Sequence, residues 1–177
     1  MSKIALSIMK IRRLIPSDAS AFQAFRLSGL LEVPSAFGSS YEEEKDFPAS
    51  TIEGRLAIKP DRGPFGAFEN DTLVGLVALG RESMNKLAHK ALIWGMYVAP
   101  SARGKGIGRA LLLEALTLAR SVPEIKQVNL CVNAGNASAI RLYEAVGFKA
   151  FGREPGAMFI NGEFHDELHM YLRLTDG

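Results

Sequence analysis

The chain has 177 residues, a typical length for one domain. Hydrophobic residues make up 47% of it and charged residues 23%, so its composition matches soluble globular domains and argues against intrinsic disorder. A net charge of +2 is too small to indicate a nucleic acid or a membrane surface as a partner. The single cysteine, Cys131, excludes an intrachain disulfide and a multi-cysteine metal site. These values predict one domain over residues 1–177.

The N-terminal stretch MSKIALSIMKIRR (1–13) has a short apolar piece followed by basic residues, with no small-residue cleavage site, so it does not resemble a signal peptide. The longest apolar run, ALIWGMYVA (91–99), has nine residues, whereas a membrane-spanning helix needs roughly 18. We therefore expect a cytoplasmic protein that does not insert into a membrane.

The first predicted elements are a strand and a helix. The strand covers 8–15, and the helix covers 18–31, because apolar residues recur there at helical spacing. Gly29 and Pro34 are expected to end this helix.

A long polar connection over 34–47 comes next, and connections of this length in a compact domain are often functional. Residues 49–59 are expected to form a second, short helix. Ser50 or Thr51 is its expected N-cap, and Pro60 stands beyond its end.

The hydrophobic period then changes to two, which predicts strands. PFGAFE (64–69) and TLVGLVALG (72–80) flank Asn70-Asp71, a pair typical of tight hairpin turns. The second of these strands is apolar on both faces, so we expect it to lie centrally in a sheet and to be covered on both sides. ALIWGMYVAP (91–100) is predicted to be another such strand.

The last part of the chain predicts two helices and three strands. Apolar side chains recur on one face of a helix that begins at Ile107 and ends before Pro123. Asn136 is a favourable N-cap, and Gly147 a favourable C-cap, for the second helix. The strands cover 127–133 and the two sides of a turn at Asn161-Gly162.

Antiparallel hairpins thus come first along the chain, and strand–helix–strand crossovers come later. This order predicts an α/β (α+β) fold. We expect a mixed central sheet with helices on both faces.

The stretch APSARGKGIGRA (99–110) places three glycines at every second position, among two arginines and a lysine. It follows a predicted strand and opens a predicted helix, whose N-terminal amides attract anions. It is not the nucleotide P-loop, because Lys105 does not follow the last glycine, nor the dinucleotide-binding turn, because Arg109 stands where that motif needs glycine. The loop is therefore predicted to hold a phosphate; a solvated structural turn is the alternative.

The spacing Arg103-x-x-Gly106-x-Gly108 resembles the acyl-CoA pyrophosphate motif of the GNAT superfamily of acetyl-CoA-dependent N-acetyltransferases. MYVAPSARGKGIGRALL (96–112) resembles that family's strand–loop–helix core, and NAGNASAIRLYEAVGF (133–148) resembles its second cofactor-facing segment. The resemblance implies a GNAT-like, mostly antiparallel sheet of about seven strands. It also implies acetyl-CoA (coenzyme A) as the cofactor and direct transfer of the acetyl group to an amine in a ternary complex.

The resemblance further implies which residues contact acetyl-CoA. Backbone groups of Met96, Tyr97 and Val98 are expected to pair with the pantetheine arm like an added strand, and an N–H there is the expected oxyanion donor. Asn133 and Asn136 are expected to contact the cofactor, while Asn136 also caps its helix. The pyrophosphate is expected on the loop residues Arg103, Gly104, Lys105, Gly106, Ile107, Gly108 and Arg109.

Acetyl transfer to an amine sets chemical requirements for the site. Deprotonating an alkyl amine with a pKa near 10.4 costs about 4.6 kcal/mol at pH 7, so the site needs a base or must select the neutral amine. A nearby acid helps the thiolate to leave. Tyr143 matches the tyrosine that the family commonly places near the CoA sulfur, so it is the candidate acid and a further cofactor contact; a core tyrosine is the alternative.

The sequence leaves the general base open. Glu82, just past a predicted strand, is the first candidate, with a solvated strand-end charge as the alternative. His89 is a second candidate. EEEK (42–45) is expected to be a solvated helix face, although a carboxylate there could attract a cationic amine. A chain of water molecules could also serve as the base.

The late segment HDELH carries two imidazoles and two carboxylates. On a strand, His165, Glu167 and His169 share one face, and Asp166 lies on the other. No metal site is expected, because acetyl transfer in the resembled family needs none. Cys131 lies in an apolar strand and is predicted to be a buried, inert thiol.

The sequence therefore leaves two functions of different classes open. The first is an N-acetyltransferase that acts on an amine-bearing small molecule or on a protein N-terminus or lysine. The alternative is a non-catalytic acyl-CoA-binding sensor or regulatory module. Nucleic-acid binding is not expected, because the sequence has no broad basic face and no aromatic-studded strand. The apolar content of 157–174 and the resemblance together suggest a homodimer.

Overall fold

The computed structural model describes residues 9–174, and the segment considered for a signal peptide lies largely outside them, as does the first residue of the strand predicted over 8–15. Seven strands form one sheet in the order β1-β2-β3-β4-β5-β7-β6. The strands are β1 (Met9–Arg13), β2 (Arg62–Glu69), β3 (Thr72–Arg81), β4 (Lys90–Val98), β5 (Gln127–Asn133), β6 (Lys149–Ile160) and β7 (Glu163–Arg173). The α-helices are α1 (Ala19–Glu32), α2 (Tyr41–Glu44), α3 (Ala49–Arg55), α4 (Ile107–Ser121) and α5 (Ala137–Val146).

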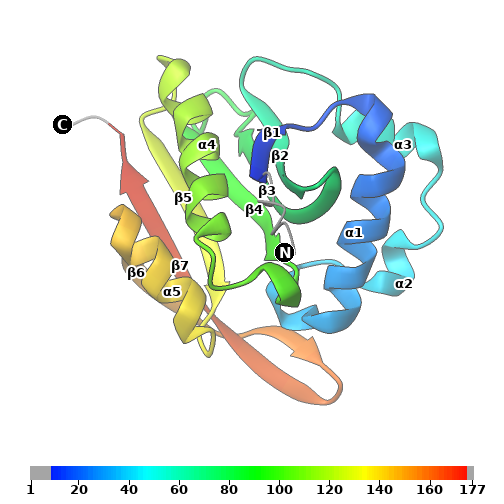
Figure 1. Ribbon diagram of the computed structural model, residues 1–177. Coiled ribbons are helices and arrows are strands. Elements are labelled where there is room, and N and C mark those ends of the chain that lie inside the picture. Colours follow the sequence, from blue (N-terminus) through cyan, green and yellow to red (C-terminus); the bar gives the residue numbers. More distant parts are fainter. Residues whose placement is uncertain (1–8, 175–177) are drawn as a thin grey trace, which may run out of the picture.

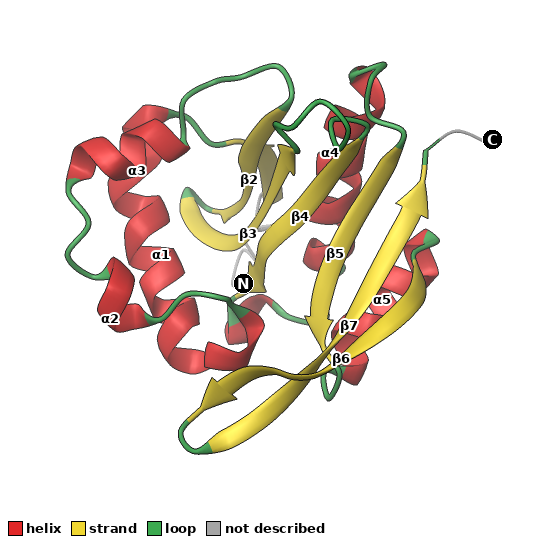
Figure 2. Cartoon of the chain, turned by 180° about the vertical axis from the view of Figure 1, so that it is seen from behind, coloured by secondary structure: helices red, strands yellow, loops and turns green. Residues whose placement is uncertain are grey.

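The sheet is antiparallel except between β4 and β5, which are joined by the crossover through α4 and run parallel. This parallel pairing is short, because it joins only Lys90–Leu92 to Gln127–Asn129. Beyond it the two strands diverge, as Figure 2 shows. The expected mixed, mostly antiparallel sheet of about seven strands is confirmed.

Helices cover both faces of the sheet, as predicted. Helices α4 and α5 lie on one face (Figure 1), and Leu111 and Leu112 of α4 share a core with Val77 of β3. On the other face, Phe22 of α1 and Ile52 of α3 share a second core with the far side of β3. The two cores explain why β3 is apolar on both sides.

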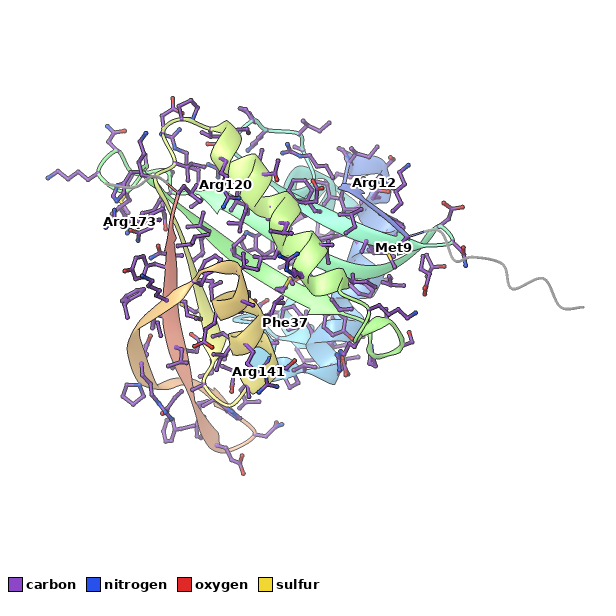
Figure 3. The ribbon with its side chains drawn as sticks, turned by 60° about the vertical axis from the view of Figure 1, so that its left-hand side comes forward. Met9, Arg12, Phe37, Arg120, Arg141 and Arg173 are labelled. Carbon is purple, nitrogen blue, oxygen red and sulfur yellow. The ribbon has the colours of Figure 1, made fainter. Side chains whose placement is uncertain are left out.

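Figure 3 shows α4 lying across the sheet, with Arg120 near its end and Arg141 on the neighbouring helix α5. On the opposite side, α1, α2 and α3 gather over the first strands, and Figure 2 shows no helix in front of β5 and β7 among the described residues. That open part of the sheet is called the open face below. None of the helices within 9–174 is long and apolar enough to cross a membrane.

The two predicted hairpin turns and the predicted cap at Asn136 are confirmed. Asn70 and Asp71 both have positive φ, which is the geometry of a two-residue hairpin turn, and the pair Asn161-Gly162 turns in the same way. Asn136 caps α5, because its Oδ1 accepts a hydrogen bond from the N–H of Ala139 at 3.1 Å.

The first helix ends one residue beyond its predicted end at 31 and just before Pro34, as expected, but Gly29 does not terminate it. Helix α1 continues to Glu32, and the N–H of Val33 donates to the carbonyl of Gly29 at 2.9 Å. A Cβ on Gly29 would lie 3.0 Å from the rings of both Phe37 and Tyr97. Glycine is therefore used here for close packing inside a helix rather than to terminate it.

Two further boundaries differ from the predictions. The connection over 34–47 contains the short helix α2, which begins with a capping box in which Ser40 and Glu43 bond to each other's backbone. The next helix, predicted over 49–59, follows Pro48 and ends at Arg55, because the chain then turns to bury Leu56 in the second core. The predicted caps Ser50 and Thr51 lie inside its first turn.

The expected solvated face over 42–45 is corrected at one residue. Glu44 is only 2% exposed and accepts two hydrogen bonds of 2.7 Å from Arg26, together with bonds from Ser39 and Arg55. Burial by itself raises the pKa of Glu44, but the hydrogen bonds from Arg26 and Ser39 outweigh it and bring the pKa to about 2. This carboxylate ties α1, α2 and α3 together and does not face solvent.

Candidate functional site

A hollow of about 770 Å³ opens where β4 and β5 diverge, and its volume is typical of small-ligand sites. Its walls come from segments far apart in the sequence: the end of β4, the glycine loop, the start of α5 and the turn after α1. The structure brings most of the predicted cofactor residues together there. Those lining the hollow are Met96, Tyr97, Val98, Arg103, Gly104, Gly106, Ile107, Gly108, Arg109, Asn133 and Asn136.

Strand β4 bends at the hollow because it contains a bulge. Trp94 and Tyr97 are three positions apart, whereas their partners on β3, Ala78 and Leu76, are only two apart. Gly95, which lies between Trp94 and Tyr97, has a φ of 63° that favours glycine. Since pairing of β4 with β5 ends at Leu92, the β5-facing backbone edge of β4 has no strand partner beyond it in the described sheet. This edge can therefore receive an extended ligand as an added strand.

The glycine loop presents backbone amides at the other end of the hollow. Gly104 and Gly106 have φ of 75° and 78°, values that a side chain would make strained. The first N–H groups of a helix have no partner within the helix and are often capped by a side chain. Gly106, the N-cap of the 15-residue helix α4, has no side chain, so these N–H groups lack a side-chain cap. Such an uncapped helix start, with its partial positive charge, suits a phosphate.

The three cations of the loop have different partners. The guanidinium of Arg103 donates to Glu32 at 2.8 Å and to the carbonyl of Val98 at 2.9 Å. Lys105 pairs with Glu69 at 3.1 Å and does not line the hollow. Arg109 lines the hollow and forms no ion pair within residues 9–174. Arg109 is therefore the side-chain cation most available to an anion.

Glu32 is a functional candidate that the sequence did not identify. The hydroxyl of Tyr97 donates to Glu32 at 2.6 Å, so the end of α1, strand β4 and the glycine loop meet at this one carboxylate. Burial and the bond to Glu32 raise the pKa of Tyr97 to about 12. The hydrogen bonds from Tyr97 and Arg103 in turn lower the pKa of Glu32. The sequence could not show that Glu32 holds Tyr97 and Arg103, because these segments meet only in the folded chain.

Asn133 and Asn136 line the hollow, and the side chain of each also accepts a hydrogen bond from the backbone. Asn133 Oδ1 accepts from the N–H of Gly135 at 2.8 Å, and Asn136 caps α5 as described. In each case the Oδ1 atom is engaged, and the side-chain amide N–H₂ group is left to donate to a ligand.

Tyr143 lies in the core on α5 and is 5% exposed. Its ring packs edge-on against Phe148 at a centroid distance of 5.9 Å, and it is not one of the residues that line the hollow. Burial raises the pKa of its phenol to about 12. The side chain is thus a protonated phenol in the core, on the same helix as Ala139 and Leu142, which line the hollow.

The candidate bases lie in different places. Glu82 lines a separate, smaller cavity with Lys90, away from the glycine loop, and His89 is exposed just before β4. His165, which the sequence raised only as part of a metal hypothesis, lines the hollow. No group of histidine, cysteine and acidic residues within 9–174 could hold a metal ion.

The prediction that Cys131 is buried is wrong. The thiol is exposed, because alternate residues of β5 point away from the core and Cys131 shares the open-face side with Asn133. Leu130 and Val132, its neighbours in sequence, occupy the buried side instead.

Comparisons with known proteins agree with this geometry. Residues 29–148 match the family model described as the acetyltransferase (GNAT) family. The spermidine N(1)-acetyltransferase of Vibrio cholerae is 33% identical over 100 residues, and the matched stretch spans 56% of each chain. The chain thus spans little more than half the length of this relative.

Solved structures share the fold over nearly the whole chain. An acetyltransferase of the GNAT family from Streptococcus pneumoniae superposes with a TM-score of 0.84 at 23% identity, covering 94% of this chain and 100% of that one. A GNAT superfamily phosphinothricin acetyltransferase from Sinorhizobium meliloti, solved with acetyl-CoA, gives 0.78 at 22% identity and covers 96% and 90%.

Proposed function

Because the chain belongs to the acetyltransferase (GNAT) family, we propose that it is an acetyl-CoA-dependent N-acetyltransferase that passes the acetyl group directly to a primary amine. The observation that carries this proposal is the hollow where β4 and β5 diverge, with an unpaired strand edge along one side and uncapped helix amides at one end. An elongated thioester with a pyrophosphate fits both features. When bound, acetyl-CoA would supply an activated acetyl group.

Different parts of the cofactor would bind at the two ends of the hollow. The first amides of α4, with Gly106 and Gly108 at the approach, would hold the pyrophosphate, and Arg109 would add a charge-assisted hydrogen bond. The backbone of Met96–Val98 would pair with the pantetheine arm, and Asn133 and Asn136 would donate from their amides.

The chain's own groups would then assist the transfer. A backbone N–H at the β4 bulge would stabilise the negative charge that develops on the carbonyl oxygen. Tyr143 would protonate the leaving sulfur, a role supported by its matching position in the family motif. Its pKa of about 12 leaves the phenol protonated at neutral pH, although it makes the phenol a weaker acid than an exposed tyrosine. Because Tyr143 is not among the residues that line the hollow, this role requires its hydroxyl to reach the bound cofactor.

The acceptor amine would approach from the open face. His165 of β7 is the imidazole that lines the hollow, so we assign it, directly or through water, as the group that takes the amine proton. Glu82 is not assigned this role, because it belongs to the other cavity. The acceptor class is an amine on a small molecule or on a protein; the relative named for spermidine acts on a polyamine, which lies within that class.

A thiol-release assay tests this function. Acetyl-CoA at fixed concentration is incubated with a panel of polyamines, amino acids and N-terminal or lysine peptides, and free coenzyme A is measured. We expect release that depends on one amine class. Tight binding of acetyl-CoA without release under any amine would instead identify an acyl-CoA-binding module.

A further inference from the structure

A thiol, an imidazole and a carboxylate lie in line across three neighbouring strands of the open face. Cys131 Sγ of β5 is 3.3 Å from Nδ1 of His169 on β7, and Nε2 of His169 is 3.0 Å from Oε2 of Glu154 on β6. Cys131 and His169 are direct partners in the antiparallel pair of β5 and β7, so the backbone itself sets their approach. None of the three lines the hollow described above.

The same thiol borders a second cavity of about 110 Å³. Its lining includes His169 and Phe151 from β7 and β6, together with Lys90 and Glu82. The space exceeds that needed by a single water molecule, so a group of a few heavy atoms can reach the sulfur. Because one ammonium and one carboxylate face this space together, it favours a neutral group over a charged one.

The surroundings decide how this thiol can react. Although Cys131 is exposed, partial desolvation by its neighbours and the charges of Glu167 and Glu154 raise its pKa, so the thiol keeps its proton at neutral pH. His169 can accept that proton at Nδ1 while its Nε2–H donates to Glu154, which fixes the tautomer. This is the order of nucleophile, base and orienting carboxylate that activates thiols in other proteins.

We propose that Cys131 is a base-assisted nucleophile and a site of covalent modification by small, neutral disulfides. In the step, the Cys131 proton passes to Nδ1 of His169 while Sγ attacks one sulfur of the disulfide. The new S–S bond forms as the old one breaks, and the departing thiolate takes the proton from His169. Cys131 is oxidised to a mixed disulfide, and one half of the reagent is reduced to a thiol.

The modification would affect the site of acetyl transfer, a consequence that rests on the proposed function. Asn133, two residues from Cys131 on the same side of β5, lines the hollow. A group attached to Cys131 would therefore stand on the open face from which the acceptor amine approaches, and it would obstruct the acceptor more than acetyl-CoA.

Because the chain has one cysteine, the rate of its reaction can be measured directly. The reagent is 2-hydroxyethyl disulfide, and mass spectrometry follows mixed-disulfide formation at pH 7. We expect His169→Gln, which keeps a hydrogen-bond acceptor but removes the base, to react at least about tenfold more slowly than the unaltered chain. His165→Gln is the matched control for the thiol reaction, because it removes an imidazole from the same face of the same strand without touching Cys131. Equal rates for the unaltered chain and His169→Gln would overturn the proposal.

A second measurement needs no variant. If His169 removes the proton during attack, the unaltered chain reacts more slowly in D₂O than in H₂O, and equal rates at matched pH and pD would contradict base assistance. The effect on function is tested separately: the mixed disulfide should lower acetyl transfer reversibly, and Cys131→Ser should be insensitive to the reagent. If no amine is acetylated, only the proposed function fails, and the thiol rates still decide this inference.

Discussion

At the scale of single residues, the cations of the glycine loop are distinguished by their partners. Arg103 is held by Glu32 and Val98, and Lys105 by Glu69, whereas Arg109 lines the hollow without an ion pair in the described residues. Of the three loop cations, we therefore expect mainly Arg109 to contact a bound anion, together with the backbone amides at the start of α4.

This difference predicts unequal effects on coenzyme A binding. Arg109→Ala should raise the Kd for coenzyme A about tenfold or more, the value of one charge-assisted hydrogen bond, and should reduce the salt dependence of binding. Arg103→Ala should raise it less, because its guanidinium is already bonded to Glu32. Titration calorimetry at two salt concentrations measures both, and a larger loss from Arg103→Ala would show that the Glu32 pair opens when the cofactor binds.

Tyr143 gives the second prediction at this scale. Removing its hydroxyl in Tyr143→Phe should lower kcat by about tenfold or more while leaving the Kd for acetyl-CoA nearly unchanged, because only proton donation to the sulfur is lost. Since the pKa of Tyr143 is raised to about 12, the acid form persists at neutral pH and is lost only as the pH approaches that value. Unchanged kcat with an unchanged thermal midpoint would remove Tyr143 from the mechanism.

At the scale of elements, a buried ion cluster joins the three helices α1, α2 and α3. Glu44 of α2 joins Arg26 of α1 and Arg55 of α3, and Arg26 also lies against the rings of Phe37 and Trp94. Trp94 precedes the β4 bulge, so the cluster supports the strand on which the proposed cofactor edge depends.

Glu44→Gln should therefore lower the free energy of unfolding by about 3 kcal/mol at pH 7, because it leaves Arg26 buried without its counter-charge. Since folding lowers the pKa of Glu44 to about 2, the stabilisation is present above its ordinary value near 4.5 and is lost as the pH falls toward 2. Urea unfolding at pH 7, pH 4 and pH 2 should show that most of the difference between the two proteins persists at pH 4 and that they converge only near pH 2.

Glu42→Gln is the matched control for this variant. Glu42 pairs with Lys45 on the same short helix but is 73% exposed, so its loss should change stability by less than about 1 kcal/mol. Equal effects of the two substitutions would mean that the buried cluster contributes no more than a surface pair.

At the scale of the whole molecule, the long hairpin of β6 and β7 extends from the sheet and exposes apolar rings. Phe159 and Phe164 are 64% and 75% exposed and pack against each other at 4.8 Å between centroids. Because β6 is an edge strand, we expect a second copy of the chain to cover this hairpin. Sedimentation should give a dimer that Phe164→Ser weakens, and a monomer at all concentrations would contradict this.

The sequence predicts the fold well, because the caps at Asn136 and Gly147 and the turn at Asn70-Asp71 are local signals that the structure confirms. Most of the predicted cofactor residues lie together around the hollow, and their contact with acetyl-CoA stays a prediction. The roles of Glu32 and Glu44 could not be read in this way, since each depends on segments that meet only after folding.

The exposure of Cys131 shows a related limit. Alternation along β5 reveals that Cys131 and Leu130 face opposite sides, but not which side a helix covers. That depends on where α5 packs and on the insertion of β7 between β5 and β6, which are properties of the assembled sheet.

A crystal structure with acetyl-CoA would show directly whether the acyl donor lies where β4 and β5 diverge. We expect the pyrophosphate on the amides of 106–109 at the start of α4, the pantetheine paired with Met96–Val98, and the sulfur within hydrogen-bonding reach of the Tyr143 hydroxyl. A cofactor bound elsewhere, or one whose pantetheine leaves the β4 edge unpaired, would contradict this expectation.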